Sequence, residues 1–152
     1  LIKNMIYLFL SGARIELRTV LLQQNIGYLS QIANLISEKL PWISYWAIMQ
    51  LEPIGFARKQ YSSKFYDNSK NFSLIKLALD CAKIKGVPVK LFNFPTCTIH
   101  KNYRDLACKS ISDWKNKYLN ECTKCNEKIN CCGFFEWYTD NSRYSKIGPE
   151  YL

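Results

Sequence analysis

Four of the seven cysteines lie close together in the last third of the chain. Cys122 and Cys125 form a C-x2-C pair, Cys131 follows after five residues, and Cys132 comes directly after Cys131. A tight turn over two residues brings both sulfurs of such a pair to one metal site, and zinc sites and iron–sulfur clusters both use this spacing. The spacing therefore predicts a metal site, because packing alone rarely brings so many cysteines together.

Two ligand sets are open for this site, and both include Cys97, which follows a predicted strand. The first set consists of thiols alone: Cys97, Cys122, Cys125 and Cys131. The second set has 21 residues between its halves, a spacing typical of zinc ribbons, and consists of Cys97, His100, Cys122 and Cys125.

The other cysteines and the histidine have simpler interpretations. Cys81 lies on the apolar face of a predicted helix and is expected in the core. Cys108 is expected in the core or on the surface, and one of Cys131 and Cys132 is expected not to bind, because adjacent cysteines seldom ligate one metal equally well. His100 is the only histidine, and no nucleophile–base pair is evident beside it.

Composition limits the class of protein. The chain has 152 residues, of which 48% are apolar, so it can bury the core of one domain. Its formal net charge of +9 is dispersed along the sequence, which suits anionic partners or simply keeps the protein in solution. No apolar run approaches the length of a membrane span, and Ile6–Leu10 is too short for the core of a signal peptide. We therefore expect no membrane partner. The odd cysteine count and the C-x2-C pair favour metal binding over disulfide bonds, which predicts a location in the reducing cytoplasm.

Predicted strands and helices alternate over residues 1–95. Helices are expected over residues 1–10, 25–40 and 74–85, with a loop over 56–70, and strands over 13–22, 43–51 and 87–92. In the first strand, Arg18 shares a face with Glu16 and Val20, opposite an apolar face. Such alternation implies right-handed crossovers and a parallel sheet, hence an α/β fold that is either a small open sheet or part of a barrel. After Pro95 a basic helix is expected over 101–119, before the cysteines.

Four segments resemble a known family. They are Glu52–Ala57 (Glu-Pro-Ile-Gly-Phe-Ala), Leu91–Cys97 (Leu-Phe-Asn-Phe-Pro-Thr-Cys), Lys109–Lys115 (Lys-Ser-Ile-Ser-Asp-Trp-Lys) and Glu121–Phe135 (Glu-Cys-x2-Cys-x5-Cys-x-Gly-Phe-Phe). Together they resemble the C-terminal half of the His-Xaa-Ser system radical SAM maturases of the HxsC type. The resemblance extends from about Ala13 to Phe135.

The resemblance implies the last strand–helix units of a partial (β/α)6 radical SAM barrel in residues 1–95. Residues 96–152 would form a Cys-rich, mainly irregular or helical extension with an auxiliary [4Fe–4S] cluster. The matching positions select the ligand set Cys97, Cys122, Cys125 and Cys131. The family's polar groups at the mouth of the barrel contact cofactor and substrate, which makes Arg18 and Glu52 candidate cofactor-binding residues. A surface ion pair for Arg18 and a turn cap for Glu52 remain alternatives.

One departure from the family limits what the chain is expected to do. Radical SAM enzymes bind their catalytic [4Fe–4S] cluster through C-x3-C-x2-C, and that spacing does not occur here. S-adenosylmethionine and the second cluster are therefore expected in a longer protein, of which this chain would be a C-terminal part inactive on its own. The implied partners are a reductant protein and a peptide or small-protein substrate, with His-Xaa-Ser repeats suggested by the family. The alternative is a zinc-ribbon-like module that binds nucleic acid. If the chain belongs to a maturase, nucleic acid is not an expected partner.

Overall fold

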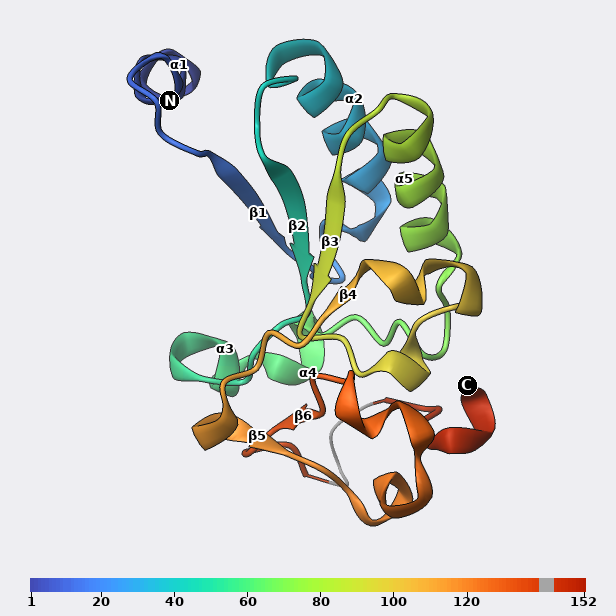
Figure 1. The fold of residues 1–152 in the computed structure, drawn as a ribbon. Helices are drawn as coiled ribbons and strands as arrows, with labels where there is room; N and C mark the ends of the chain where they lie inside the picture. The colour runs from blue at the N-terminus through green and yellow to red at the C-terminus, as the bar shows by residue number, and fades with distance from the viewer. Residues whose placement is uncertain (140–143) are drawn as a thin grey trace.

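The computed structural model describes residues 1–139 and 144–152 and shows a mixed α/β fold (Figure 1). Four strands form a parallel sheet: β1 (Glu16–Val20), β2 (Tyr45–Met49), β3 (Val89–Phe92) and β4 (Ala107–Cys108). The α-helices are α1 (Ile2–Leu10), α2 (Leu29–Lys39), α3 (Gly55–Lys59), α4 (Tyr61–Lys64) and α5 (Ser73–Ile84). The described residues include no helix with the length and apolar character needed to cross a membrane.

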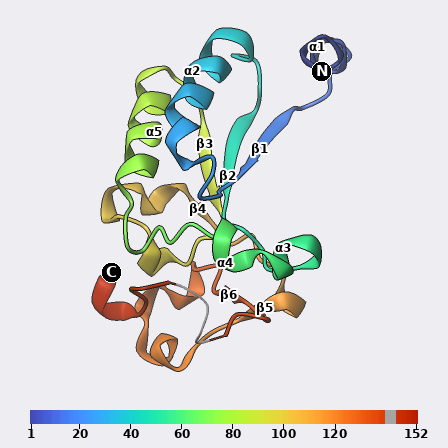
Figure 2. The same ribbon diagram turned by 180° about the vertical axis from the view of Figure 1, so that it is seen from behind.

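Each strand of the parallel sheet is added on the same side of the strand before it. Its strands follow the chain in the order β1-β2-β3-β4. α2 connects β1 to β2, α5 connects β2 to β3, and the two helices pack against each other beside the sheet (Figures 1 and 2). Successive right-handed crossovers in the same direction put their helices on one face. The opposite face carries Arg18 and Val20 exposed to solvent, as the alternation in this strand predicted.

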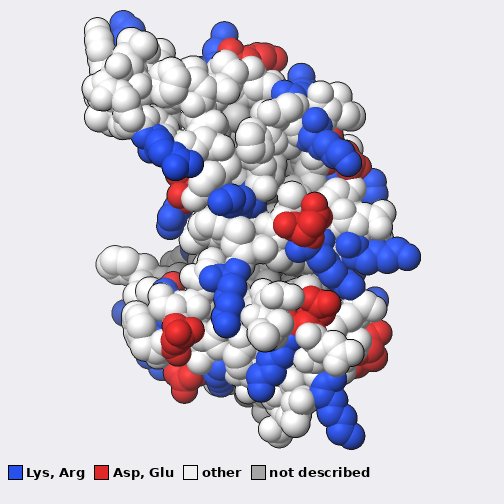
Figure 3. All heavy atoms as spheres, in the orientation of Figure 1, with Lys and Arg blue, Asp and Glu red and all other residues white. Residues whose placement is uncertain are grey.

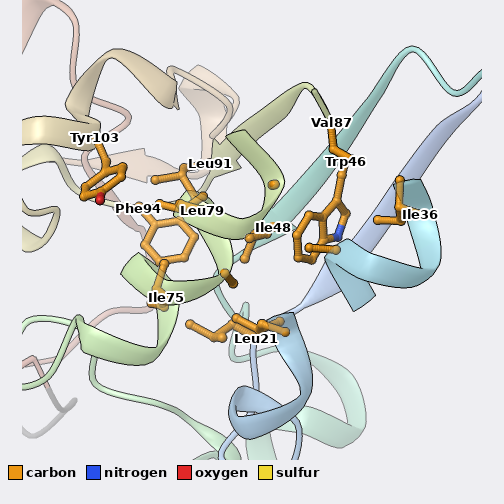
Figure 4. Close-up of a cluster of buried hydrophobic side chains, with 14 of the residues drawn as sticks. Leu21, Ile36, Trp46, Ile48, Ile75, Leu79, Val87, Leu91, Phe94 and Tyr103 are labelled. Carbon is orange, nitrogen blue, oxygen red and sulfur yellow. The ribbon is translucent and has the colours of Figure 1, made fainter. Parts of the chain in front are cut away.

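The core lies between the sheet and these two helices, where the apolar faces predicted by the sequence meet (Figure 4). Trp46 and Ile48 from β2 and Leu91 from β3 are fully buried there. The Trp46 indole donates a 2.9 Å hydrogen bond to the Thr19 hydroxyl of β1, so its buried N–H is satisfied. The side chains that cover them from α2 and α5 include Leu29, Ala33, Ile36, Ile75, Ala78 and Leu79.

The residues after β3 form an extension at the carboxyl ends of the longer strands (Figure 1). β4 pairs with β3, so the parallel sheet continues beyond residue 95. β5 (Asn116–Lys117) and β6 (Phe134–Phe135) form a small antiparallel sheet. The other regular pieces are the 3-10 turns Thr96–Thr98, Lys101–Leu106, Asp113–Lys115, Asn120–Lys124, Asn126–Ile129 and Pro149–Tyr151.

Two expected elements differ from the structure. The segment 56–70 contains most of α3 and all of α4, each only about one turn long, which is too short to produce a visible apolar period. The segment 101–119 is not an α-helix but a 3-10 turn followed by β4, a second 3-10 turn and β5. Its backbone groups pair with β3 and β6, which are distant in sequence, and this pairing overrides local helix propensity.

Candidate metal centre

The four cysteines predicted as ligands line one pocket in the extension. Cys97 comes from the first 3-10 turn after β3, Cys122 and Cys125 from the turn 120–124 and its end, and Cys131 from the residues before β6. The pocket has an internal volume of about 20 Å³, and Phe134 is among its apolar lining residues. Segments up to 34 residues apart in the chain thus bring four cysteines to the lining of one small pocket.

The thiols share this space without meeting at one point. Among the described residues, no three His, Cys, Asp or Glu side chains converge closely enough to hold a single metal ion. A tetrahedral zinc site brings sulfurs to within about 3.8 Å of one another, since Zn–S bonds are about 2.3 Å. An iron–sulfur cluster binds each thiolate to a different iron and accepts a wider arrangement. The four thiols would therefore have to move together to bind zinc.

Cys131 has the surroundings of a thiolate. The backbone N–H groups of Thr96 and Gly133 each donate to its Sγ across 3.3 Å. The neighbouring Cys132 thiol, followed by these donors from Thr96 and Gly133, lowers the pKa of Cys131 to about 5 despite its burial. A thiolate is the form that binds metals, so Cys131 is prepared for that role.

Cys97 and Cys122 are held in the opposite state. Burial raises the pKa of Cys97 to about 11, although a hydrogen bond from the Gly148 backbone partly opposes it. Burial also raises the pKa of Cys122. These two thiols therefore keep their protons at neutral pH, and a metal would have to displace those protons in order to bind.

The turn that carries Cys131 depends on Gly133. This glycine has a φ of +68°, and a β-carbon there would lie 2.8 Å from the backbone oxygen of Lys117. The Asn116 side chain donates to the Cys132 carbonyl across 2.6 Å, and the Tyr118 hydroxyl donates to the Cys131 carbonyl across 3.0 Å. The residues of β5 and Tyr118 thus fix the position of Cys131, through the close approach of the Lys117 backbone to Gly133 and through two hydrogen bonds to the backbone carbonyls.

Cys97 is positioned through a left-handed residue at the end of β3. Asn93 has a φ of +65°, a conformation that asparagine adopts more readily than most residues. Its backbone N–H donates to the Ser110 hydroxyl across 2.7 Å, and that hydroxyl donates to the Asn93 side-chain oxygen across 3.0 Å. Ser110 therefore holds the bend that directs the chain from β3 toward Cys97.

A chain of buried amides supports the same turn and was not recognised in the sequence. The Gln50 amide, just after β2, donates to the Asn68 side-chain oxygen across 2.9 Å. Asn68 in turn donates to the Thr98 carbonyl across 2.7 Å, and all three residues are at most 3% exposed. The only indication in the sequence was a glutamine at the end of an apolar strand. Because buried amides must be paired, this chain links the sheet to the Cys97 turn.

The two candidate cofactor-binding residues have separate partners. Arg18 lies on the face of the sheet opposite α2 and α5, pairs with Glu16 and has its guanidinium 5.6 Å from the centre of the Phe92 ring. Glu52 follows β2 and pairs with Lys115 at 3.3 Å. The ion pair that was an alternative for Arg18 is therefore present, and Glu52 joins the sheet to the extension.

The remaining cysteines and His100 lie outside the lining of the cysteine pocket. Cys132 is 1% exposed and packs with Ile111 and Phe135. Cys81 packs against the main core, as expected, and its thiol donates to the Asn34 side-chain oxygen across 3.3 Å. Cys108 is half-buried on β4. His100 lines a separate hollow next to Cys97.

Comparisons with known proteins identify no relative of this chain. The chain matches no protein-family model, and neither a curated protein nor a solved structure matches it. The resemblance to radical SAM maturases therefore stays a prediction from the motifs.

Proposed function

We propose that this chain is the cluster-bearing C-terminal part of a radical SAM maturase that modifies a peptide or small protein. Its own site would be an auxiliary [4Fe–4S] cluster bound by Cys97, Cys122, Cys125 and Cys131. The observation that carries the proposal is that these four cysteines line one small pocket. Each comes from a motif that resembles the family.

The arrangement of the sheet supports the barrel part of the proposal. Parallel strands in consecutive order, with both crossover helices on one face, are the arrangement from which (β/α) barrels are built. The uncovered face would then line the interior of a partial (β/α)6 barrel. Arg18 and Lys90 lie there in register on either side of Ala47, and Glu52 follows the carboxyl end of β2.

The residues of the chain would perform distinct tasks around the cluster. Four thiolates hold four irons and leave no open coordination position, so the bound cluster supplies one-electron chemistry or braces the extension. The amides of Thr96 and Gly133 donate to the Cys131 sulfur and so tune the reduction potential. Cysteine ligands must stay reduced until they bind, which fits a cytoplasmic location.

The proposed roles of the lumen residues concern binding alone. Arg18 carries a charge toward the open face and is suited to a carboxylate, as on S-adenosylmethionine or a peptide substrate. Glu52 accepts hydrogen bonds at the strand end while it is paired with Lys115. The catalytic cluster that cleaves S-adenosylmethionine would require cysteines in a spacing that this sequence lacks.

Metal analysis of the anaerobically reconstituted chain tests the proposal. We expect about four irons and four acid-labile sulfides per chain, with the visible absorption of an iron–sulfur cluster. Cys125→Ser should abolish most of this content, while Cys81→Ser, which changes a cysteine of the main core, should retain it. Absence of iron and sulfide from the reconstituted wild-type chain would overturn the proposal.

The zinc-ribbon alternative is distinguished by the same measurement. It requires zinc without sulfide, and it predicts that His100→Ala lowers the zinc content. It also predicts binding of RNA or DNA that weakens steeply with salt, since basic side chains would neutralise phosphates. The net charge of +9 favours it, whereas the position of His100 outside the cysteine pocket does not.

A further inference from the structure

A second and larger hollow is lined by residues from the segments 68–72, 97–104 and 146–152. Its volume is about 330 Å³, which suits a small-molecule ligand. No aspartate or glutamate is among the described residues that line it. Four residues with basic side chains do line it, and none of the four lines the cysteine pocket: His100, Lys101, Arg104 and Lys146.

The positive charges of the hollow are largely unopposed. Over the face shown in Figure 3 as a whole, acidic and basic side chains are interspersed. In the hollow, by contrast, Lys101 and Lys146 are exposed, and neither forms an ion pair with an acidic residue that the structure describes. Leu152 also lines the hollow, and a main-chain carboxylate there would still leave two of the three lysine and arginine charges unopposed. Like charges gathered in a concave surface attract an anionic ligand.

Arg104 contributes a cation that is fixed in place. Its Nε donates to the Ile99 carbonyl across 3.1 Å, and its Nη2 donates to the Tyr151 carbonyl across 2.7 Å. A guanidinium has five N–H groups, so these two bonds leave three for a ligand. Both acceptors are neutral, so they do not cancel the charge. A fixed, planar guanidinium of this kind matches the oxygens of a phosphate group.

Backbone hydrogen bonds prepare His100 and Lys146 for the same role. The Asn102 N–H donates to His100 Nδ1 across 3.4 Å, which places the proton of a neutral imidazole on Nε2 and leaves that N–H as a donor. The Lys146 N–H donates to the Ser69 hydroxyl across 3.0 Å, so the segment that carries this lysine is held beside the residues that precede α5.

Aromatic rings line the hollow together with these cations. The half-buried Phe72 stacks with His100, with ring centres 6.5 Å apart and an angle of 24° between the ring planes. Tyr151 is a further aromatic residue of the lining and is 42% exposed. Nucleobases stack on such rings, whichever base they are, because every base has a π-face. The hollow thus combines a surface for a base with cations for phosphate groups.

We propose that this hollow binds a nucleoside diphosphate. The base packs against the rings of Phe72 and Tyr151, and the two phosphates contact Arg104, Lys101 and Lys146. Two linked phosphates carry several negative charges, so they interact with the three cations more strongly than a single carboxylate does. The site does not depend on the proposed cluster, since none of these cations lines the cysteine pocket.

Calorimetric titration with ADP at low ionic strength tests the site, with matched pairs of substitutions. Lys101→Gln combined with Lys146→Gln removes two charges from the hollow. Lys39→Gln combined with Lys85→Gln removes two charges from the ends of α2 and α5, which lie at the opposite end of the sheet from the extension (Figure 1). Thermal unfolding of both variants is measured first, so that lost folding is not mistaken for lost binding.

The hollow variant should lose about tenfold or more in affinity for ADP, and the control about twofold or less. The wild-type affinity should fall as salt is raised, because salt screens the exposed lysines. No binding of about 1 mM ADP to the wild-type chain would overturn the proposal. Equal losses in both variants, or no loss in either, would overturn it as well.

Ligands that lack one part of ADP test the two halves of the site. Pyrophosphate has no base and should bind about fivefold or more weakly than ADP. Adenosine has no phosphates and should bind about tenfold or more weakly. Equal affinity of either compound and ADP would overturn the assignment to a nucleoside diphosphate. So would a single-stranded oligoadenylate that binds far more tightly than ADP and loses this affinity only in the hollow variant, since nucleic acid would then be the ligand.

Discussion

The Lys115 ammonium lies 3.3 Å from each of the two carboxylate oxygens of Glu52. The two residues are 63 positions apart in the chain, and both side chains are about one-fifth exposed. Lys115 also lies 5.7 Å from the ring centres of Trp114 and Phe135. This pair therefore connects the carboxyl end of β2 to the segment that leads into the cysteine pocket.

Removal of the Lys115 charge should destabilise the chain more than removal of an exposed lysine would. Lys115→Met leaves the half-buried Glu52 carboxylate without its partner, and we expect a loss of between about 1 and 3 kcal/mol in the free energy of unfolding. Urea denaturation monitored by tryptophan fluorescence measures it. The double variant Glu52→Gln with Lys115→Met should lose less than the sum of the single losses, and strict additivity would mean that the pair does not interact.

Gly133→Ala should damage both stability and metal retention. The left-handed backbone and the 2.8 Å approach of the Lys117 carbonyl leave no room for a β-carbon, so β5 or the Cys131 turn must shift. We expect a loss of about 2 kcal/mol or more, together with less iron per chain after reconstitution. Gly27→Ala is the matched control, because a β-carbon there meets nothing within 4 Å. Similar effects of the two substitutions would contradict the close approach.

Local patterns were sufficient to predict much of the fold. The apolar spacing of α2 and α5 and the alternation in β1 are properties of continuous segments, and each appears in the structure as expected. β4 could not be predicted in this way, because two residues carry no period and their strand geometry comes from pairing with β3.

In the candidate site, too, local spacing could be predicted from the sequence and long-range contacts could not. The sequence alone predicts Cys97, Cys122 and Cys125 as ligands in both possible sets, and the resemblance selects the set that contains Cys131 instead of His100. The Asn93–Ser110 pair and the chain from Gln50 to Thr98 bring together segments 17 or more residues apart. Such long-range contacts leave no signature in the spacing of one sequence.

Loss of the Thr96 amide should make the proposed cluster harder to reduce. Thr96 follows a proline with extended geometry and opens a 3-10 turn, where the fixed φ of proline is accommodated. Thr96→Pro therefore removes the N–H that donates to Cys131 while it preserves the local backbone. Fewer hydrogen bonds to a thiolate lower the reduction potential of its cluster, and potentiometric titration followed by electron paramagnetic resonance measures the shift.

Thr96→Ala is the control for this substitution, because it keeps the amide and removes only the side chain. Its cluster should have a potential closer to the wild-type value than that of Thr96→Pro. An unchanged potential in the proline variant, with full iron content, would show that the Thr96 amide does not act on the cluster.

Asp80 should make stability depend on pH in the acid range. Hydrogen bonds from Lys76 (2.6 Å) and from the Tyr103 hydroxyl (2.5 Å) lower the pKa of Asp80 below its ordinary value of 3.8. A carboxylate with a lower pKa in the folded chain stabilises it above the ordinary pKa, and that contribution is lost as the pH falls through the folded pKa. We therefore expect the free energy of unfolding to fall more steeply below pH 4 in the wild type than in Asp80→Asn.

Tyr103→Phe separates the hydroxyl from the buried ring, which packs against the main core. This variant should keep the ring packing and reduce the acid-range slope, because Lys76 and the charge of Lys83 then lower the pKa of Asp80 without the tyrosine hydrogen bond. The effect is expected to be small, since Asp80 is partly exposed and water screens its charge. Denaturant midpoints at pH 3, 4 and 6 measure the slope, and parallel profiles for the wild type and Asp80→Asn would rule out this role for the carboxylate.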